Sequence, residues 1–270
     1  MYRIDRSLPS AAATDGVRRG DEEVLSLVAE PFTSVEETDR TLHELERLFR
    51  ERGDRRAVFL TVYARVTREV AAGIERGEFE DPAWVAEYLV TFADFYRRAL
   101  YDFETGNEDA LPNAWRFFFR ATGTDDSLVV QNAVLGVNAH VNYDLALALR
   151  TVGIDSDRAA KYRDHRRINE VLWRLVDETV DRLARTYAPG IATVADLSGP
   201  LAEGLWVLAL AVGREGAWWT AVVLTDSRWD VLRSCARRTM GWFSVAVAYL
   251  VLGPNGHSLL LNSLRKVEGR

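Results

Sequence analysis

Apolar side chains recur at three- and four-residue intervals along almost the whole 270-residue chain, which is the spacing of one face of an α-helix. The clearest run places Val58, Val62, Val66, Val70 and Ile74 four residues apart. Alternation of apolar and polar residues, the pattern of a half-buried β-strand, never extends beyond about four residues. The sequence therefore predicts an all-α protein, a single-domain bundle of about eight to ten helices.

Several predicted helices carry capping signals at their first residues. Ser34 and Glu37 have capping-box spacing, in which the serine oxygen accepts the Glu37 amide and the glutamate reaches back to the Ser34 amide. Asp81 followed by Pro82 opens another helix, because proline suits the first helical position. We expect residues 1–20 to form a flexible N-terminal arm and residues 21–270 to form the single helical domain.

Composition limits the partners that the chain can bind. The net charge is −6, so neither nucleic acid nor anionic lipid held by bulk charge is an expected partner. Cys235 is the single cysteine, which excludes an intrachain disulfide and a zinc site built from cysteines. We expect Cys235 to be a small buried side chain.

The sequence also bears on location. The first 20 residues carry charges and no apolar core, so they do not resemble a secretory signal. The longest uncharged apolar stretch, Thr239–Gly253, has 15 residues and is too short to span a bilayer. We expect that stretch to be a buried core helix and the protein to be soluble and cytoplasmic. The oligomeric state stays open.

One predicted helix, at about residues 126–152, is apolar nearly all round, which is typical of a central helix. Polar side chains nevertheless interrupt it, namely Gln131, Asn132, Asn138, His140, Asn142 and Asp144. At about 100° per residue, His140 and Asp144 share one face, and the asparagines at 138 and 142 share another. A buried polar group without a partner costs about 1–3 kcal/mol, so these groups either satisfy one another or line a cavity.

The face with His140 and Asp144 is the stronger candidate for a site, because it holds the two titratable groups. A short connection should make the next helix an antiparallel neighbour, and that helix offers His165. Two histidine nitrogens and a carboxylate oxygen would suit a divalent metal such as zinc. A core network in which His140 simply bonds Asp144 is an equally open alternative.

If the protein is an enzyme, metal-assisted hydrolysis of an ester or phosphoester is the first expectation, because a bound metal lowers the pKa of its water toward 7. Asp164 or Glu170 would then be the catalytic base. Asn138 and Asn142 would contact the ligand, or would serve mainly as hydrogen-bond donors to adjacent helices.

Tryptophan is frequent toward the C-terminus, where five of the eight lie after residue 200. Core packing is the usual role of such rings. The alternative function is a non-catalytic binding module, in which a tryptophan-rich helical pocket encloses an apolar or lipid-like small molecule. Arg214, one turn before Trp218 on the same helix face, would hold an anionic group of that ligand. We expect Arg214 to be paired or to face the pocket.

The segment Asn138-Ala-His-Val-Asn-Tyr-Asp-Leu145 resembles the hallmark of a helical family of bacterial and archaeal proteins that is known only as a domain of unknown function. The segments Glu78–Trp84, Phe92–Tyr96 and Arg163–Leu172 fit the same pattern, and the resemblance covers about residues 55–225. It implies a helical fold and brings no activity with it.

A fainter likeness is to zinc-dependent phospholipase C-like helical hydrolases, in which His-x-x-x-Asp on a central helix binds metal. His140 and Asp144 match that element. The partner motif His-x-x-x-Glu is absent, because Asn169 lies four residues after His165. That departure argues against a three-zinc site.

Overall fold

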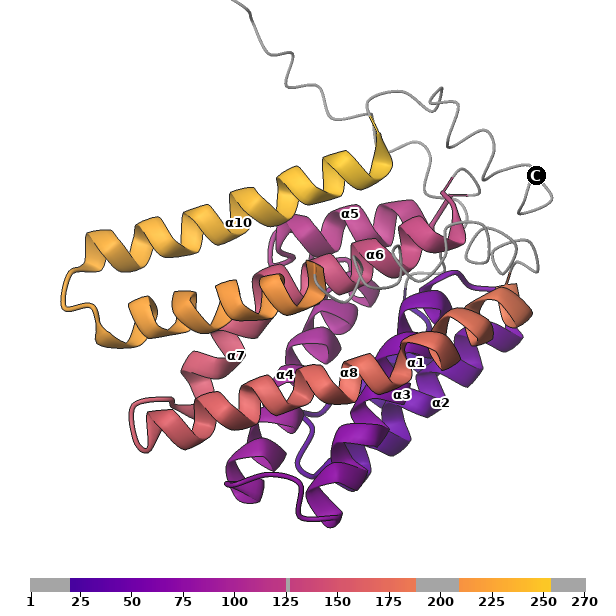
Figure 1. The fold of residues 1–270 in the computed structure, drawn as a ribbon. Helices are drawn as coiled ribbons and strands as arrows, with labels where there is room; N and C mark the ends of the chain where they lie inside the picture. Colours follow the sequence, from indigo (N-terminus) through magenta and orange to yellow (C-terminus); the bar gives the residue numbers. More distant parts are fainter. Residues whose placement is uncertain (1–19, 125–126, 188–208, 254–270) are drawn as a thin grey trace, which may run out of the picture.

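The computed structural model describes residues 20–124, 127–187 and 209–253, and within these ranges every regular element is helical (Figure 1). In chain order the elements are α1 (Glu22–Val28), α2 (Val35–Glu51), α3 (Arg56–Glu75), α4 (Pro82–Glu104), α5 (Asn113–Thr122), α6 (Val129–Ala139), η2 (His140–Asp144), α7 (Leu145–Val152), α8 (Arg158–Tyr187), a helix over residues 209–226, and α10 (Asp230–Leu252). The predicted all-α, single-domain bundle is thus confirmed. The expected N-terminal arm lies outside the described residues.

The predicted helix boundaries hold where capping chemistry defines them. The Ser34 side chain accepts the amide of Glu37, and Asp81 accepts the amide of Trp84 at the start of α4. The other half of the expected capping box differs, because the Glu37 carboxylate bonds the backbone and hydroxyl of Thr33. Several helices end just before a glycine with positive φ, where other residues are strained.

The central helix predicted at about 126–152 corresponds to α6, η2 and α7, which follow one another without a break. It packs against α3, α4, α5 and α10 (Figure 1). The helix after the next turn, α8, packs mainly against α3 and also touches α4. The expectation that α7 and α8 pack along each other is therefore wrong. A short connection limits the distance between two helices but does not set the angle between them.

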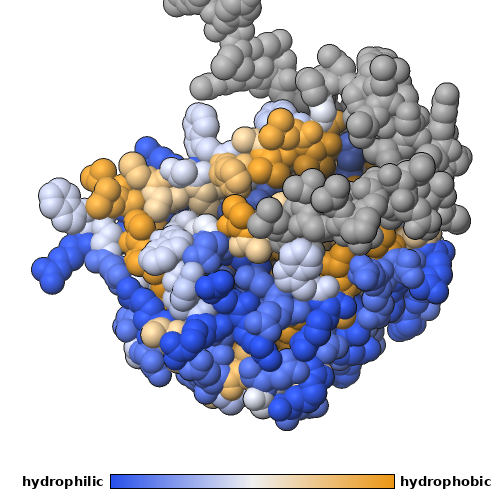
Figure 2. All heavy atoms as spheres, in the orientation of Figure 1, coloured by the Kyte–Doolittle hydropathy of each residue, from blue (hydrophilic) through white to orange (hydrophobic). Residues whose placement is uncertain are grey.

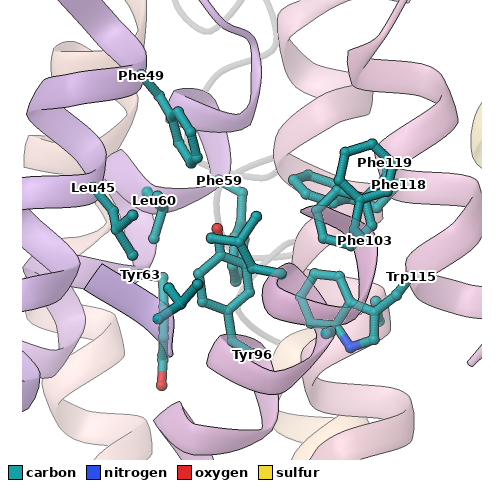
Figure 3. Packing of buried hydrophobic residues seen from close by; sticks show 14 of the residues in the cluster. Leu45, Phe49, Phe59, Leu60, Tyr63, Tyr96, Phe103, Trp115, Phe118 and Phe119 are labelled. Carbon is teal, nitrogen blue, oxygen red and sulfur yellow. The ribbon is translucent and has the colours of Figure 1, made fainter. Parts of the chain in front are cut away.

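Aromatic side chains from α3, α4 and α5 meet in the core beside this central helix (Figure 3). The Phe59 ring lies within 6 Å, centroid to centroid, of the rings of Tyr96, Trp115 and Phe118. A Cβ built on Gly136 would lie 2.5 Å from the Phe59 ring. Only glycine at position 136 therefore lets α6 approach α3 this closely.

The C-terminal helices are less buried than the sequence predicts. Trp218 is buried, but Trp219, Trp229 and Trp242 are exposed, so core packing is wrong for these three side chains. Cys235 is exposed too, which corrects the expectation that it is buried. It lies on the outward side of α10, four residues after the exposed Val231. None of the described helices is long and apolar enough to cross a membrane.

Candidate functional site

The polar residues of the central helix lie on a local change of helix type. His140–Asp144 is a turn of π-helix between α6 and α7, closed by a bond from the Leu145 amide to the His140 carbonyl. π-turns are rare in globular proteins and are frequent at functional sites. The sequence did not predict this turn, because the pattern of apolar residues continues through it.

His140 and Asp144 project from this turn into the interior and bond each other. The distance from His140 Nδ1 to Asp144 Oδ2 is 3.1 Å. Trp115 Nε1 donates to the same carboxylate oxygen at 2.8 Å. With Asp144 ionised, its oxygen accepts from Nδ1, so the proton of the neutral imidazole resides on Nδ1 and Nε2 carries a lone pair.

Burial sets the ionisation of this pair. It lowers the pKa of His140, and the hydrogen bond to Asp144 opposes that shift only in part. Burial also raises the pKa of Asp144, against the opposing effects of His140 and Trp115. Both shifts disfavour charge, as expected for groups removed from water.

His140 Nε2 is buried and has no hydrogen-bond partner in the described part of the chain. The imidazole is held between aromatic rings, stacked on Phe92 with centroids 3.6 Å apart and meeting Tyr63 edge-on at 4.5 Å. A buried acceptor without a partner costs about 1–3 kcal/mol, so it requires a ligand, a water molecule or a functional reason.

A cavity of about 100 Å³ lies against this histidine. Its wall is mainly apolar and comes from α3, α4, the central helix, α8 and the helix over residues 209–226. The lining residues are Phe59, Val62, Tyr63, Val66, Thr67, Val70, Val85, Tyr88, Leu89, Phe92, Val137, His140, Val141, Ile168, Leu172, Leu210 and Arg214. An apolar cavity with a few polar groups is the usual form of a small-molecule site.

Arg214 supplies the positive charge of this cavity. Its side chain is buried, and it donates to the Asn169 side chain at 2.7 Å and to the His165 carbonyl at 2.7 Å. Both acceptors are neutral, and no carboxylate among the described residues forms an ion pair with it. Arg214 lines the cavity, which is one of the two expected positions, and its hydrogen bonds go to neutral groups instead of a carboxylate. A buried cation paired only with neutral groups attracts an anion.

His165, the second predicted metal ligand, has partners on both ring nitrogens. Nδ1 lies 3.1 Å from the Tyr88 hydroxyl, and Nε2 lies 3.1 Å from the Arg214 carbonyl. Burial and the charge of Arg214 hold the pKa of His165 well below its ordinary value. The Arg214 carbonyl can only accept, so Nε2–H donates to it, and Nδ1 accepts from the Tyr88 hydroxyl. No lone pair of His165 is therefore left for a metal.

The two predicted bases also lie in places that do not suit catalysis. The Asp164 carboxylate is buried and accepts the backbone amides of Glu80 and Asp81, both at 2.8 Å, just before α4. Glu170 is exposed and bonds Arg167. The described residues contain no group of three or more His, Cys, Asp or Glu that could hold a metal ion.

Asn138 joins the central helix to α10, and Asn142 supports Asn138 from within the central helix. Asn138 Nδ2 donates to the Ser244 carbonyl at 2.8 Å, and Asn142 Nδ2 donates to Asn138 Oδ1 at 2.9 Å. This geometry matches a role in bonding helices together. Trp218 lies behind the cavity wall, where its ring contacts Tyr162 and His165. The wall is therefore built from phenylalanine, tyrosine and valine instead of tryptophan.

The sequence did not predict that Trp115, Phe92 and Tyr63 lie around the His140–Asp144 pair. The aromatic segment that holds Trp115 stands out in the sequence, but nothing there indicates that its indole N–H reaches Asp144. Phe92 and Tyr63 occupy ordinary apolar positions on their helices, so only the packing of α3 and α4 on the central helix identifies them.

Comparison with known proteins gives a family and no activity. The model of a family of unknown function, DUF5995, matches residues 35–254, so the chain belongs to that family. This match confirms the resemblance to a helical domain of unknown function. Neither the curated proteins nor the solved structures contain a significant match.

Proposed function

We propose that the protein binds a small, mainly apolar molecule that carries an anionic group, with the apolar part in the cavity beside His140. The observation that carries this proposal is that one apolar wall holds both an acceptor without a partner and a buried cation without a counter-ion among the described residues. One is His140 Nε2, a buried acceptor without a partner. The other is the buried guanidinium of Arg214, which has neutral partners only. A ligand that satisfies both removes two costs of the empty cavity.

The cavity volume limits the size of the ligand. A cavity of about 150 Å³ holds benzene, and the cavity here measures about 100 Å³. The enclosed part of the ligand is therefore no larger than a single ring or a short alkyl chain.

The two polar groups define the chemistry at the ends of that ligand. A carboxylate fits Arg214, because guanidinium–carboxylate hydrogen bonds are charge-assisted. His140 Nε2 accepts a hydrogen bond, so it favours a hydroxyl or amide N–H on the ligand. The ligand class is thus a hydroxylated aromatic or short alkyl acid.

Binding is tested with benzoate, 4-hydroxybenzoate and benzylamine, measured by calorimetry and by the shift in melting temperature that a ligand of the folded state produces. We expect both acids to bind, 4-hydroxybenzoate to bind more tightly, and benzylamine not to bind. If benzylamine binds as well as the acids, or if neither acid binds, the proposal is wrong.

Three variants connect binding to the cavity. Val66→Phe fills the cavity and should abolish binding of both acids, whereas Val212→Phe, on the solvent side of its helix, should leave it unchanged. His140→Phe should weaken 4-hydroxybenzoate about tenfold and leave benzoate unchanged, since one hydrogen bond is worth roughly 1.4 kcal/mol. Equal loss of both acids in His140→Phe would contradict the role given to Nε2.

Metal-assisted hydrolysis has less support than binding. His140 and Asp144 bond each other, but His165 and Asp164 are occupied by other partners. Elemental analysis of protein purified without chelator tests this hypothesis. A stoichiometric transition metal that is lost in His140→Phe would replace the binding proposal with a metal site.

A further inference from the structure

The first half of α10 turns three charged residues toward the bundle. Asp230, Arg233 and Arg237 recur every three or four residues, so they lie on the same side of the helix as the buried Met240. The opposite side exposes Trp242 to 79%, and Figure 2 shows hydrophobic residues gathered over this part of the molecule. A surface helix normally has the reverse arrangement, with its charges in water and its apolar residues inside.

The charged side of α10 borders two adjoining clefts that separate it from α7. They measure about 290 and 370 Å³, and Arg150 of α7 and Arg237 line both of them. Each cleft is larger than a cavity of about 150 Å³, which holds benzene. The smaller cleft is otherwise polar, with Asp230, Arg233 and Ser234 in its wall. The larger cleft adds a mainly apolar wall that comes from α4, the central helix and α10, namely Phe95, Tyr143, Leu147, Thr151 and Met240.

The clefts hold more positive than negative charge. Arg233 bonds Asp230, so these two side chains neutralise each other. Arg150 and Arg237 form no ion pair with any carboxylate in the described ranges. Because both arginines line the same two clefts, their guanidinium groups repel each other. An anion between them removes this repulsion, and a guanidinium binds phosphate oxygens through two parallel hydrogen bonds.

Tyr143 brings the π-turn His140–Asp144 into the larger cleft. Its ring lies against α10, where a Cβ built on Gly241 would be 3.8 Å from Tyr143 Cε2. Burial and the charge of Asp144 raise the pKa of Tyr143, and the charge of Arg237 opposes that shift. The phenol is therefore protonated at neutral pH and can donate a hydrogen bond to an anion held by Arg237. π-turns are frequent at functional sites, and this one contributes side chains to two separate spaces.

The charge of the clefts selects the class of anion. A phosphate monoester carries about −1.5 to −2 charges at pH 7, which balances two guanidinium groups, whereas a carboxylate carries a single charge. The apolar wall of the larger cleft favours an organic group on that phosphate. A bilayer or a second copy of the chain fits less well, because the clefts lie on the side of α10 opposite the exposed Trp242.

We propose that the clefts between α7 and α10 bind a soluble organic phosphate monoester. The phosphate lies between Arg150 and Arg237, and the organic group lies against Phe95 and Leu147. The residues that line these clefts do not line the cavity beside His140. This proposal is therefore independent of the proposed function.

Calorimetry of the full chain with phenyl phosphate and methyl phosphate tests the proposal. The two probes carry the same charge, but only the phenyl ring fills the larger cleft. We expect phenyl phosphate to bind at least about tenfold more tightly, because the ring is removed from water. Its binding should weaken as salt increases, because salt screens the arginine–phosphate attraction. Absence of saturable phenyl phosphate binding overturns the proposal, and so does equal affinity for the two probes.

Matched variants test the role of the two arginines. Arg150→Gln together with Arg237→Gln should weaken phenyl phosphate binding at least about tenfold. Arg166→Gln together with Arg182→Gln, at two exposed positions of α8, removes the same net charge and should change the affinity less than about twofold. Equal losses in the two double variants would show that only the overall charge attracts the probe, and would overturn the proposal.

Two further measurements exclude other locations and another source of phosphate. Val66→Phe fills the cavity beside His140 and should leave phenyl phosphate binding unchanged. Loss of binding in this variant would place the probe in that cavity and overturn the proposal. Sedimentation with vesicles of phosphatidylcholine and phosphatidate should show no binding. Vesicle binding that the Arg150/Arg237 variant loses would assign the clefts to a lipid phosphate, and would overturn the proposal of a soluble ligand.

Discussion

The surroundings of His140 and His165 differ in one respect, although both imidazoles are fully buried and both have pKa values lowered by burial. His165 has a partner on each ring nitrogen, the Tyr88 hydroxyl and the Arg214 carbonyl. His140 has Asp144 on one nitrogen and none on the other. The hydrogen bonding of His165 is therefore satisfied without a ligand. His140 Nε2 is satisfied only when another molecule donates a hydrogen bond to it.

This difference shows that burial and residue type do not identify a site. Both histidines belong to i, i+4 polar pairs: His140 pairs with Asp144 on the largely apolar central helix, and His165 pairs with Asn169 on the amphipathic α8. What separates them is the cavity. His140 lines the cavity, whereas His165 does not. Tyr88 and Arg214, which bond His165, line the cavity instead. The paired histidine thus positions the groups that face the ligand.

The largest effect on stability is expected when His165, which has a partner on each ring nitrogen, is replaced. His165→Phe leaves the Tyr88 hydroxyl without its acceptor and removes one hydrogen bond from the Arg214 carbonyl, which keeps its place in the backbone hydrogen bonding of its helix. A buried hydroxyl without a partner costs about 1–3 kcal/mol and the lost hydrogen bond about 1 kcal/mol, so the free energy of unfolding should fall by about 2–4 kcal/mol. Urea unfolding of the variant and the wild type measures this change. A loss below about 1 kcal/mol would show that His165 has no structural role.

The second prediction changes the cavity wall without touching a histidine. Gly136→Ala places a Cβ 2.5 Å from the Phe59 ring, which has to move because the helix backbone holds the Cβ in place. Overpacking of this kind costs about 1–3 kcal/mol. Phe59 lines the cavity, so binding of the acid probes should weaken as well. Gly77→Ala, where a Cβ meets nothing within 4 Å, controls for strain alone and should leave binding unchanged.

The third prediction concerns pH. Both histidines have folded-state pKa values below the unfolded value of 6.5. Below pH 6.5 the unfolded chain therefore binds protons that the folded chain does not, and the free energy of unfolding falls as pH falls. For His165 this loss begins near pH 6.5 and grows as pH falls further, because burial and the charge of Arg214 hold its folded-state pKa well below the unfolded value.

Comparison of the wild type with His165→Phe isolates this contribution, because the phenylalanine does not titrate. The variant should show a shallower fall in unfolding free energy between pH 6.5 and 5. For His140 the effect is less clean, because the pKa of Asp144 is raised and its protonation in the folded state acts in the opposite direction. Identical pH profiles for the wild type and His165→Phe would contradict the neutral, buried state of His165.

The sequence was sufficient for the helices and for the polar face of the central one. Helical spacing and caps such as Asp81 are local properties, so they can be recognised without the fold. The pair His140–Asp144 is local too, four residues apart on one face. The contributions of Trp115 and Phe92 are not local, because they depend on how α4 and α5 pack against the central helix.

The same limit explains the expectations about His165 and the C-terminal tryptophans. The sequence placed His165 beside His140 through a short connection, but the angle between α7 and α8 depends on side-chain packing along α3. Exposed tryptophans such as Trp242 have the same apolar pattern as buried ones. No sequence rule distinguishes a helix that its own domain covers from a helix whose outer face stays exposed.

The smallest effect on stability, and the sharpest test of the comparison, is expected for His140→Phe. The phenylalanine keeps the stacked ring on Phe92, and the Asp144 carboxylate keeps its hydrogen bond from Trp115 Nε1. The substitution loses one hydrogen bond and removes one acceptor that has no partner, so these two contributions nearly cancel. We expect the free energy of unfolding to change by less than about 1 kcal/mol, against several for His165→Phe. Thermal and urea unfolding of both variants under one set of conditions measure the contrast.

If His140→Phe is as destabilising as His165→Phe and no acid probe binds the wild type, the two histidines are equivalent core residues. The cavity then requires no ligand.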